Sequence, residues 1–133
     1  MRWNSSRLLL VVSVAFGLVI ATRPLLAHHS FDAEYDTKKT ATISGVVTKL
    51  DWVNPHAFVY VESKDQAGKV RTFKIEMGPP YALTRQGWKR EMVKIGEQIT
   101  VEGACLAKDG SDSAGSEQTT RMVLPNGQKL PMR

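Results

Sequence analysis

The sequence contains three histidines, two of them adjacent at positions 28 and 29 and the third at position 56. If the mature chain begins at His28, its α-amino nitrogen and its imidazole Nδ1 can bind the same metal ion. A second imidazole from elsewhere in the chain completes a set of three nitrogen ligands, which suits Cu(II) and also Zn or Ni. The pattern therefore predicts a metal site formed by His28, His29 and His56, with copper as the first candidate.

Acidic residues follow the two adjacent histidines. Asp32, Glu34 and Asp36 are close enough in sequence to accept hydrogen bonds from the imidazoles and so fix their orientation. The alternative interpretation involves no metal: the adjacent histidines are solvated, and His56 forms a hydrogen bond within its own loop or caps the N-terminal segment. Both interpretations depend on where the mature chain begins.

The N-terminal segment, residues 1–27, has the features of a cleavable signal peptide. Two arginines precede an uncharged apolar run of 14 residues, which is shorter than the roughly 20 residues of a membrane-spanning helix. We expect cleavage after Ala27, which leaves His28 first. Cleavage after Ala21 and retention as an anchor are the alternatives. The segment predicts a periplasmic or secreted protein with no stable membrane span after processing.

Charge and cysteine content limit the classes of partner. The predicted leader holds three of the 18 Lys and Arg residues and none of the 13 Asp and Glu residues, so the mature chain keeps only a small positive excess. A nucleic-acid-binding domain needs a dense basic face, so we expect a metal ion, a small ligand or a periplasmic protein as the partner. Cys105 is the one cysteine, and its small apolar neighbours predict a buried thiol.

Alternating apolar and polar residues predict one mostly β domain at residues 42–133, after an N-terminal arm at 28–41. The expected strands are 43–52, 57–62, 70–77, 98–103, 119–124 and 128–132. A short helix is expected at 81–86, ended by Gly87, and the polar segment 108–116 is expected to be a mobile loop. A helix between the third and fourth strands is typical of a five-stranded OB-like barrel. Another small β-barrel or a sandwich is the alternative.

A second hypothesis for function needs no metal. The Trp52–His56 loop and the Trp88 region would form a surface for a small ligand or a protein partner, contacted by Trp52, Asn54 and Trp88. Aromatic rings can stack on a flat ligand, but large aromatic residues more often pack in a core. No set of nucleophile, base and orienting group can be proposed. We therefore expect a non-enzymatic binding module.

Five stretches of the sequence resemble the DUF6152 family of small exported bacterial proteins, a family of unknown function. They are HHSFDAEYD at 28–36, ISGVVTKLDWVNPHAFVYV at 43–61, GPPYALTRQGW at 78–88, KIGEQITVEG at 94–103 and AKDGS at 107–111. The resemblance implies export, a single domain and three histidines that form a set worth testing, but no activity. The residues around Cys105 depart from a Pro-containing stretch in the family pattern, so the resemblance implies no role for this thiol.

Overall fold

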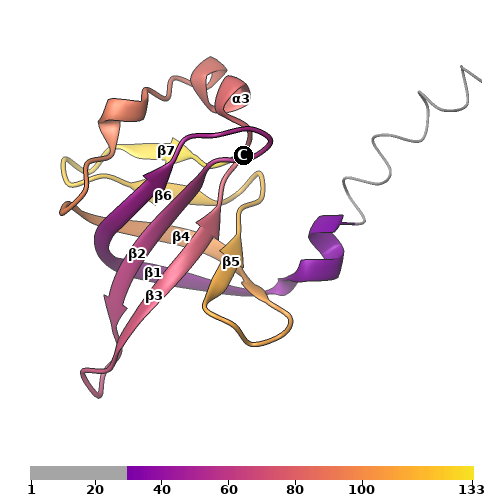
Figure 1. The fold of residues 1–133 in the computed structure, drawn as a ribbon, viewed down its shortest axis with the longest axis vertical. Helices are drawn as coiled ribbons and strands as arrows, with labels where there is room; N and C mark the ends of the chain where they lie inside the picture. Colours follow the sequence, from indigo (N-terminus) through magenta and orange to yellow (C-terminus); the bar gives the residue numbers. More distant parts are fainter. Residues whose placement is uncertain (1–29) are drawn as a thin grey trace, which may run out of the picture. The chain divides into compact units, whose positions relative to one another are not determined.

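The computed structural model describes residues 30–133, of which residues 34–133 form one compact unit. Residues 30–34 are helical. The elements that follow are drawn in Figure 1: β1 (Tyr35–Asp51), β2 (Phe58–Lys64), β3 (Val70–Glu76), the helix α3 (Pro80–Arg85), the short 3-10 helix η1 (Arg90–Met92), β4 (Gln98–Ala107), β5 (Ser113–Gly115), β6 (Arg121–Val123) and β7 (Lys129–Pro131). The predicted mostly β fold is confirmed. The predicted leader lies outside the described residues.

Five of the strands form a ring. β1 pairs antiparallel with β2 and with β4, and β2 pairs antiparallel with β3. β3 pairs in parallel with β5, which in turn pairs antiparallel with β4. The order β1-β2-β3-β5-β4 therefore returns to β1, while β6 and β7 extend the sheet from β4. Helix α3 falls between β3 and β4 at the predicted place, and it begins one residue earlier than expected.

Strand β4 is longer than the sequence pattern indicates. The expected strand ends at Gly103, but the observed strand continues to Ala107. Gly103 has a φ of 73°, and the pairing with β1 shifts between Ala41↔Ala104 and Ile43↔Val101. This irregularity is a β-bulge, in which glycine adopts a positive φ without a steric penalty. Gly103 therefore bends the strand and does not end it.

Two predicted boundaries are wrong because both segments pair with strands that are distant in sequence. β1 begins at Tyr35, so residues 35–41 of the predicted arm belong to a strand that pairs with β4. β5 lies inside the segment 108–116 that was expected to be a mobile loop, and its residues Ala114 and Gly115 are buried. Neither segment shows a strong apolar alternation. Their strand conformation is stabilised by hydrogen bonds to neighbouring strands that are distant in sequence.

The core fills the interior of the ring with apolar residues from alternating strand positions. Val59 on β2 and Ile75 on β3 have no exposed surface, and Trp88 after α3 is 1% exposed. The Trp88 indole N–H donates a hydrogen bond of 2.5 Å to the carbonyl of Pro131 in β7. This bond satisfies the polar end of a buried ring, which an apolar core alone cannot do. Trp88 thus joins the segment after α3 to the C-terminal hairpin.

Cys105 is buried and forms no disulfide, as predicted. Its burial raises the pKa of the thiol, because the thiolate is disfavoured away from water. Such a thiol is a packing residue rather than a reactive group. In residues 30–133, none of the helices has the length and apolar character needed to cross a membrane.

Candidate functional site

His56 lies in the turn that joins β1 to β2, two residues before β2 begins. The turn includes a cis peptide bond between Asn54 and Pro55. Two backbone hydrogen bonds fix it against the end of β3: Ala57 donates to the carbonyl of Gly78 at 3.2 Å, and Met77 donates to the carbonyl of Ala57 at 2.8 Å. These bonds position His56 beside Glu76, the last residue of β3.

Glu76 is the centre of a cluster that we call the Glu76 cluster, formed by Tyr35, His56, Glu76 and Arg133. The carboxylate is buried, with an 11% exposed side chain, and its Oε1 lies 3.2 Å from His56 Nδ1. Its Oε2 accepts a hydrogen bond of 3.2 Å from the Tyr35 hydroxyl. Arg133 Nη1 lies 3.9 Å from Oε1. The cluster joins the start of β1, the β1–β2 turn, the end of β3 and the C-terminal residue.

The positions of Tyr35 and Arg133 are themselves constrained. Burial is the main cause that raises the pKa of the Tyr35 phenol above its ordinary value, and the negative charges of Glu76 and Glu34 add to this effect. Tyr35 therefore remains a hydrogen-bond donor to Glu76 throughout the neutral range. Arg133 Nη1 also donates to the carbonyl of Ser116 at 3.1 Å, which holds the guanidinium near the carboxylate.

This geometry gives His56 a defined chemical role. A carboxylate beside Nδ1 favours the tautomer with the proton on Nδ1, so the lone pair is on Nε2. The His56 side chain is 33% exposed, so the ring is accessible from solvent. Carboxylate-oriented imidazoles of this kind are typical of metal-binding histidines, whose second nitrogen donates to an acidic group. The Glu76 cluster can therefore supply one oriented nitrogen ligand.

Of the three predicted site histidines, His56 is the one that lies within the described residues 30–133. His28 and His29 lie outside the described residues, so their place in a metal site stays a prediction. Asp32 and Glu34, the predicted hydrogen-bond acceptors, are exposed, and the carboxylate within contact distance of His56 belongs to Glu76. Among residues 30–133, no group of three or more His, Cys, Asp and Glu side chains is arranged to hold a metal ion.

The predicted ligand-contact residues differ in their surroundings. Asn54 is exposed in the turn, and Trp52 is half-buried against the core. The Trp52 and Trp88 ring centroids lie 6.2 Å apart with an interplanar angle of 42°. Trp88 is buried, and its indole N–H already donates a hydrogen bond to the carbonyl of Pro131. Its ring therefore packs in the core and is not at the surface where a ligand would contact it.

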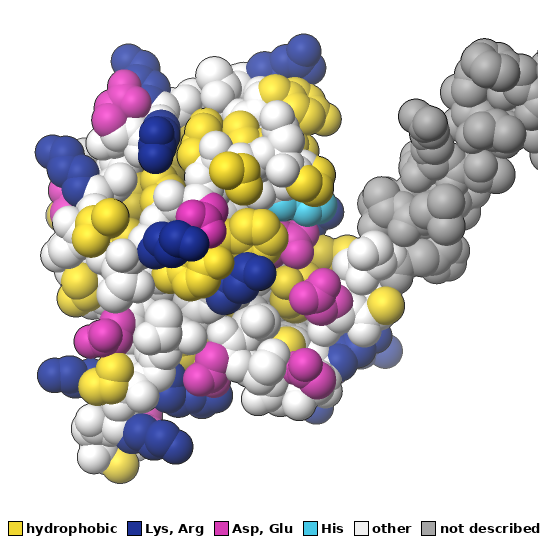
Figure 2. All heavy atoms as spheres, in the orientation of Figure 1, with side chains coloured by type: hydrophobic (Ala, Val, Ile, Leu, Met, Phe, Trp, Pro, Cys, Tyr) yellow, Lys and Arg dark blue, Asp and Glu magenta, His cyan; other side chains and the backbone are white. Residues whose placement is uncertain are grey.

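A row of aromatic and basic side chains adjoins the cluster on the outer face of β1, β2 and β3. Lys74 Nζ lies 4.3 Å from the centroid of the Phe58 ring, and Lys49 Nζ lies 5.0 Å from the centroid of the Tyr60 ring. Figure 2 shows hydrophobic and basic side chains interleaved over these strands. The cations lie over the rings, so these aromatic faces are already occupied.

Sequence comparison adds the family but no activity. Residues 15–116 match the family described as "Family of unknown function (DUF6152)", a match over more than half of the chain. The chain belongs to the DUF6152 family. The matched region of the chain includes all five strands of the ring as well as His28, His29, His56 and Glu76. No curated protein and no solved structure matches the chain.

Sequence reasoning missed Glu76, Tyr35 and Arg133 as site residues. Glu76 occupies the polar position of an alternating strand, where a solvated carboxylate is the ordinary expectation. The only sequence signal for Glu76 is its place directly before Met77-Gly78-Pro79, where the strand must end. That signal does not reveal which distant residues surround it.

Proposed function

We propose that this DUF6152 protein is an exported, non-enzymatic binding module that holds a transition metal, with copper as the first candidate. The ligands in this proposal are the α-amine and imidazole of His28, the imidazole of His29 and Nε2 of His56. The observation that carries the proposal is the contact between His56 Nδ1 and the buried carboxylate of Glu76. This contact leaves Nε2 as the available nitrogen of a partly exposed ring.

Glu76 is held firmly between His56 and Tyr35. A carboxylate that only neutralised a surface histidine would be exposed, whereas Glu76 is buried and bonded to Tyr35 on its other oxygen. Burying a carboxylate is costly unless its partners compensate for the lost water. A metal ligand benefits from such a support, because the fixed ring loses little freedom when the ion binds.

The chain length between the two halves of the site supports the proposal. His28 stands seven residues before Tyr35, which contacts Glu76 directly. Seven residues can span at most about 25 Å when extended. The tether is therefore short, which gives the N-terminal nitrogens a high effective concentration around the Glu76 cluster. Signal-peptide cleavage after Ala27 and export to the periplasm or the exterior are part of this proposal.

We also propose that the ring is an OB-like barrel. Two features support this assignment: the strand order closes through β1 and β4, and helix α3 lies between β3 and β4. Barrels of this type bind ligands on one sheet face and in the adjoining loops. The β1–β2 turn, which carries His56, is one of those loops.

The test combines the first residue of the mature protein with a copper titration. Mass spectrometry of the exported protein should give His28 as the first residue. Isothermal titration with Cu(II) alone should show binding that His56→Ala weakens at least tenfold, the loss expected for one nitrogen ligand. Glu76→Gln should weaken binding by about 10- to 100-fold through the lost orientation of His56. Glu62→Gln, an exposed carboxylate on β2, is the matched control and should bind as the wild type does.

Two results would contradict the proposal. A mature chain that begins at Thr22 would remove the amino-terminal chelate, and equal copper binding by His56→Ala and wild type would exclude His56 as a ligand. The second result would favour the alternative function, a metal-independent contact surface in the Trp52–His56 loop. The observation that favours this alternative is the 53% exposure of Val53 at the tip of that loop.

A further inference from the structure

A second candidate site lies at the end of the ring opposite to α3. The pocket there has a volume of ≈ 350 Å³. We call it the open-end pocket, and its apolar walls are Ala41, Ile43, Phe73, Leu106 and Ala107. These residues come from β1, from the middle of β3 and from the end of β4. We propose that the open-end pocket binds a neutral small molecule with one or two apolar ring systems.

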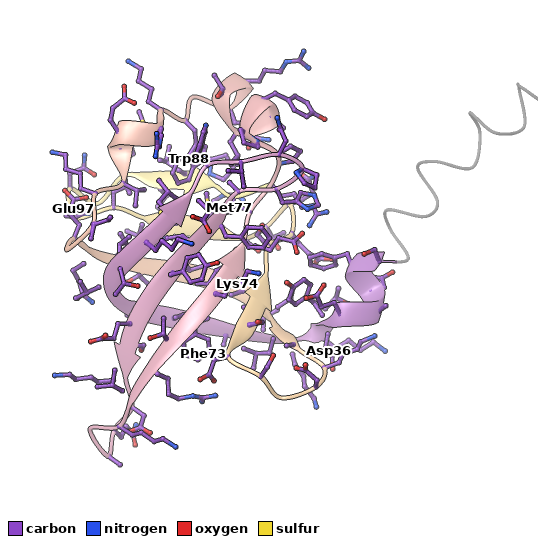
Figure 3. The ribbon with its side chains drawn as sticks, in the orientation of Figure 1. Asp36, Phe73, Lys74, Met77, Trp88 and Glu97 are labelled. Atoms are coloured by element: carbon purple, nitrogen blue, oxygen red, sulfur yellow. The ribbon has the colours of Figure 1, made fainter. Side chains whose placement is uncertain are left out.

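The size and walls of the pocket define the first part of the ligand. Ligand sites have volumes of about 300–1,000 Å³, are largely apolar and occur in the mouths of β-barrels. An apolar cavity of about 150 Å³ holds one benzene ring, so this pocket accommodates a somewhat larger molecule. Space is available because the lining residues Ala41 and Ala107 are small and Gly110 has no side chain. Figure 3 shows Phe73 toward the β2–β3 hairpin, far along the sheet from Trp88.

The polar groups of the pocket define the charge of the ligand. Arg71 also lines it, but its Nη2 forms an ion pair with Asp112. Asp65 lines it too, and its Oδ1 accepts hydrogen bonds from the backbone N–H groups of Ala67 and Lys69, at 2.9 Å each. The pocket lining therefore holds one basic and one acidic side chain and has no net charge. This balance favours a neutral molecule over an ion of either sign.

Arg71 covers one face of the Phe73 ring, so a ligand in the pocket would contact the edge or the other face of that ring. The guanidinium carbon of Arg71 lies 5.1 Å from the centroid of the Phe73 ring. These two side chains come from alternate residues of β3 and present a planar group beside an aromatic ring. An aromatic ligand can pack against Phe73 in an offset or edge-to-face arrangement, and such ring pairs gain free energy beyond that of buried area.

The wall formed by the loop after β4 is fixed before any ligand arrives. Lys74 donates a backbone hydrogen bond of 2.9 Å to the carbonyl of Asp112. The N–H of Ser111 donates to Asp109 Oδ1 at 2.9 Å, and the N–H of Gly110 donates to the carbonyl of Ala107 at 3.3 Å. A preformed pocket binds with a smaller loss of conformational freedom. These hydrogen bonds hold the pocket wall in place, which is typical of a binding site and not of an incidental gap between side chains.

The test uses N-phenyl-1-naphthylamine, a neutral two-part aromatic probe whose fluorescence increases when it leaves water. The full exported protein should bind it saturably, with one equivalent per chain. Ala41→Phe fills the pocket from β1, where Ala41 shares the inner face with its register partner Ala104, and Ser111→Tyr fills it from the exposed loop; each should weaken binding at least tenfold. Tyr81→Ser, which removes a 63% exposed ring on α3, is the control and should bind as the wild type does. Thermal unfolding of each variant verifies that it folds.

The charge of the ligand is tested with a matched probe, 8-anilinonaphthalene-1-sulfonate, which keeps the same ring system and adds a negative charge. It should bind at least tenfold more weakly than the neutral probe. The absence of saturable binding of the neutral probe would overturn the proposal, as would unchanged binding by both folded pocket variants. Tighter binding of the sulfonate would overturn the assignment to a neutral ligand. His56→Ala should leave the binding of the neutral probe unchanged, which separates this site from the proposed metal site.

Discussion

The two ends of the five-stranded ring are built from the same alternating strands but are finished differently. At the α3 end, Leu83, Trp88 and Met132 are fully buried and close the core. At the opposite end, Ala41, Ala107 and Gly110 line a pocket of ≈ 350 Å³. The comparison shows that the strand pattern sets the ring, while the size of the residues at each end decides whether that end is core or pocket.

The test with the largest expected change in stability removes one aromatic ring at each end of the ring of strands. Trp88→Ala should lower the free energy of unfolding by about 3–5 kcal/mol, because it leaves a cavity in the core. Phe73→Ala should cost only about 1–2 kcal/mol, because the Phe73 ring is half-buried at the pocket. Urea denaturation followed by circular dichroism measures both. Equal losses for the two variants would show that the ends do not differ in packing.

A finer test adds the same bulk at two paired positions, Ala104 on β4 and Ala41 on β1. Ala104 is fully buried, so Ala104→Leu should overpack the core and cost about 1–3 kcal/mol. Ala41 lines the pocket, so Ala41→Leu enters open space and should change stability by less than about 0.5 kcal/mol. Thermal unfolding monitors both variants. A large loss from Ala41→Leu would mean that the pocket is not open to a side chain of this size.

The parts predicted correctly from the sequence are those with local signals. The strand β3 and the Gly78-Pro79-Pro80 break at the start of α3 have local signals, and both are confirmed. The buried state of Cys105 is also predicted from its immediate neighbours. In each case the deciding interactions lie within a few residues of the pattern.

The parts predicted wrongly or missed depend on distant partners. β5 has only small residues, and its strand conformation comes from β3 and β4 on either side. Glu76 has the pattern of a solvated residue, and its burial comes from Tyr35 and Arg133, which lie far from it in sequence. No local pattern encodes these contacts, so the half of the candidate site formed by Glu76 could only be found in the structure.

The Glu76 cluster offers the smallest and most specific test, because it predicts how stability depends on pH. The pKa of Tyr35 is raised in the folded protein, whereas in the unfolded chain it has the ordinary value of about 10. The unfolded state therefore releases this proton first, and the contribution of Tyr35 is complete below about pH 10 and declines as the pH rises above it. Tyr35→Phe should cost about 1 kcal/mol at pH 7, the typical value of one hydrogen bond.

The decisive measurement is the difference between Tyr35→Phe and wild type in urea unfolding at pH 7, 9 and 10.5. The difference should be constant from pH 7 to 9 and shrink at pH 10.5, because only the wild type loses the contribution of Tyr35 there. Cys105 also has a raised pKa, but it is present in both proteins, so its effect cancels in the comparison. If the difference stays constant to pH 10.5, the Tyr35 phenol is not buried beside Glu76, and the Glu76 cluster loses one of its partners.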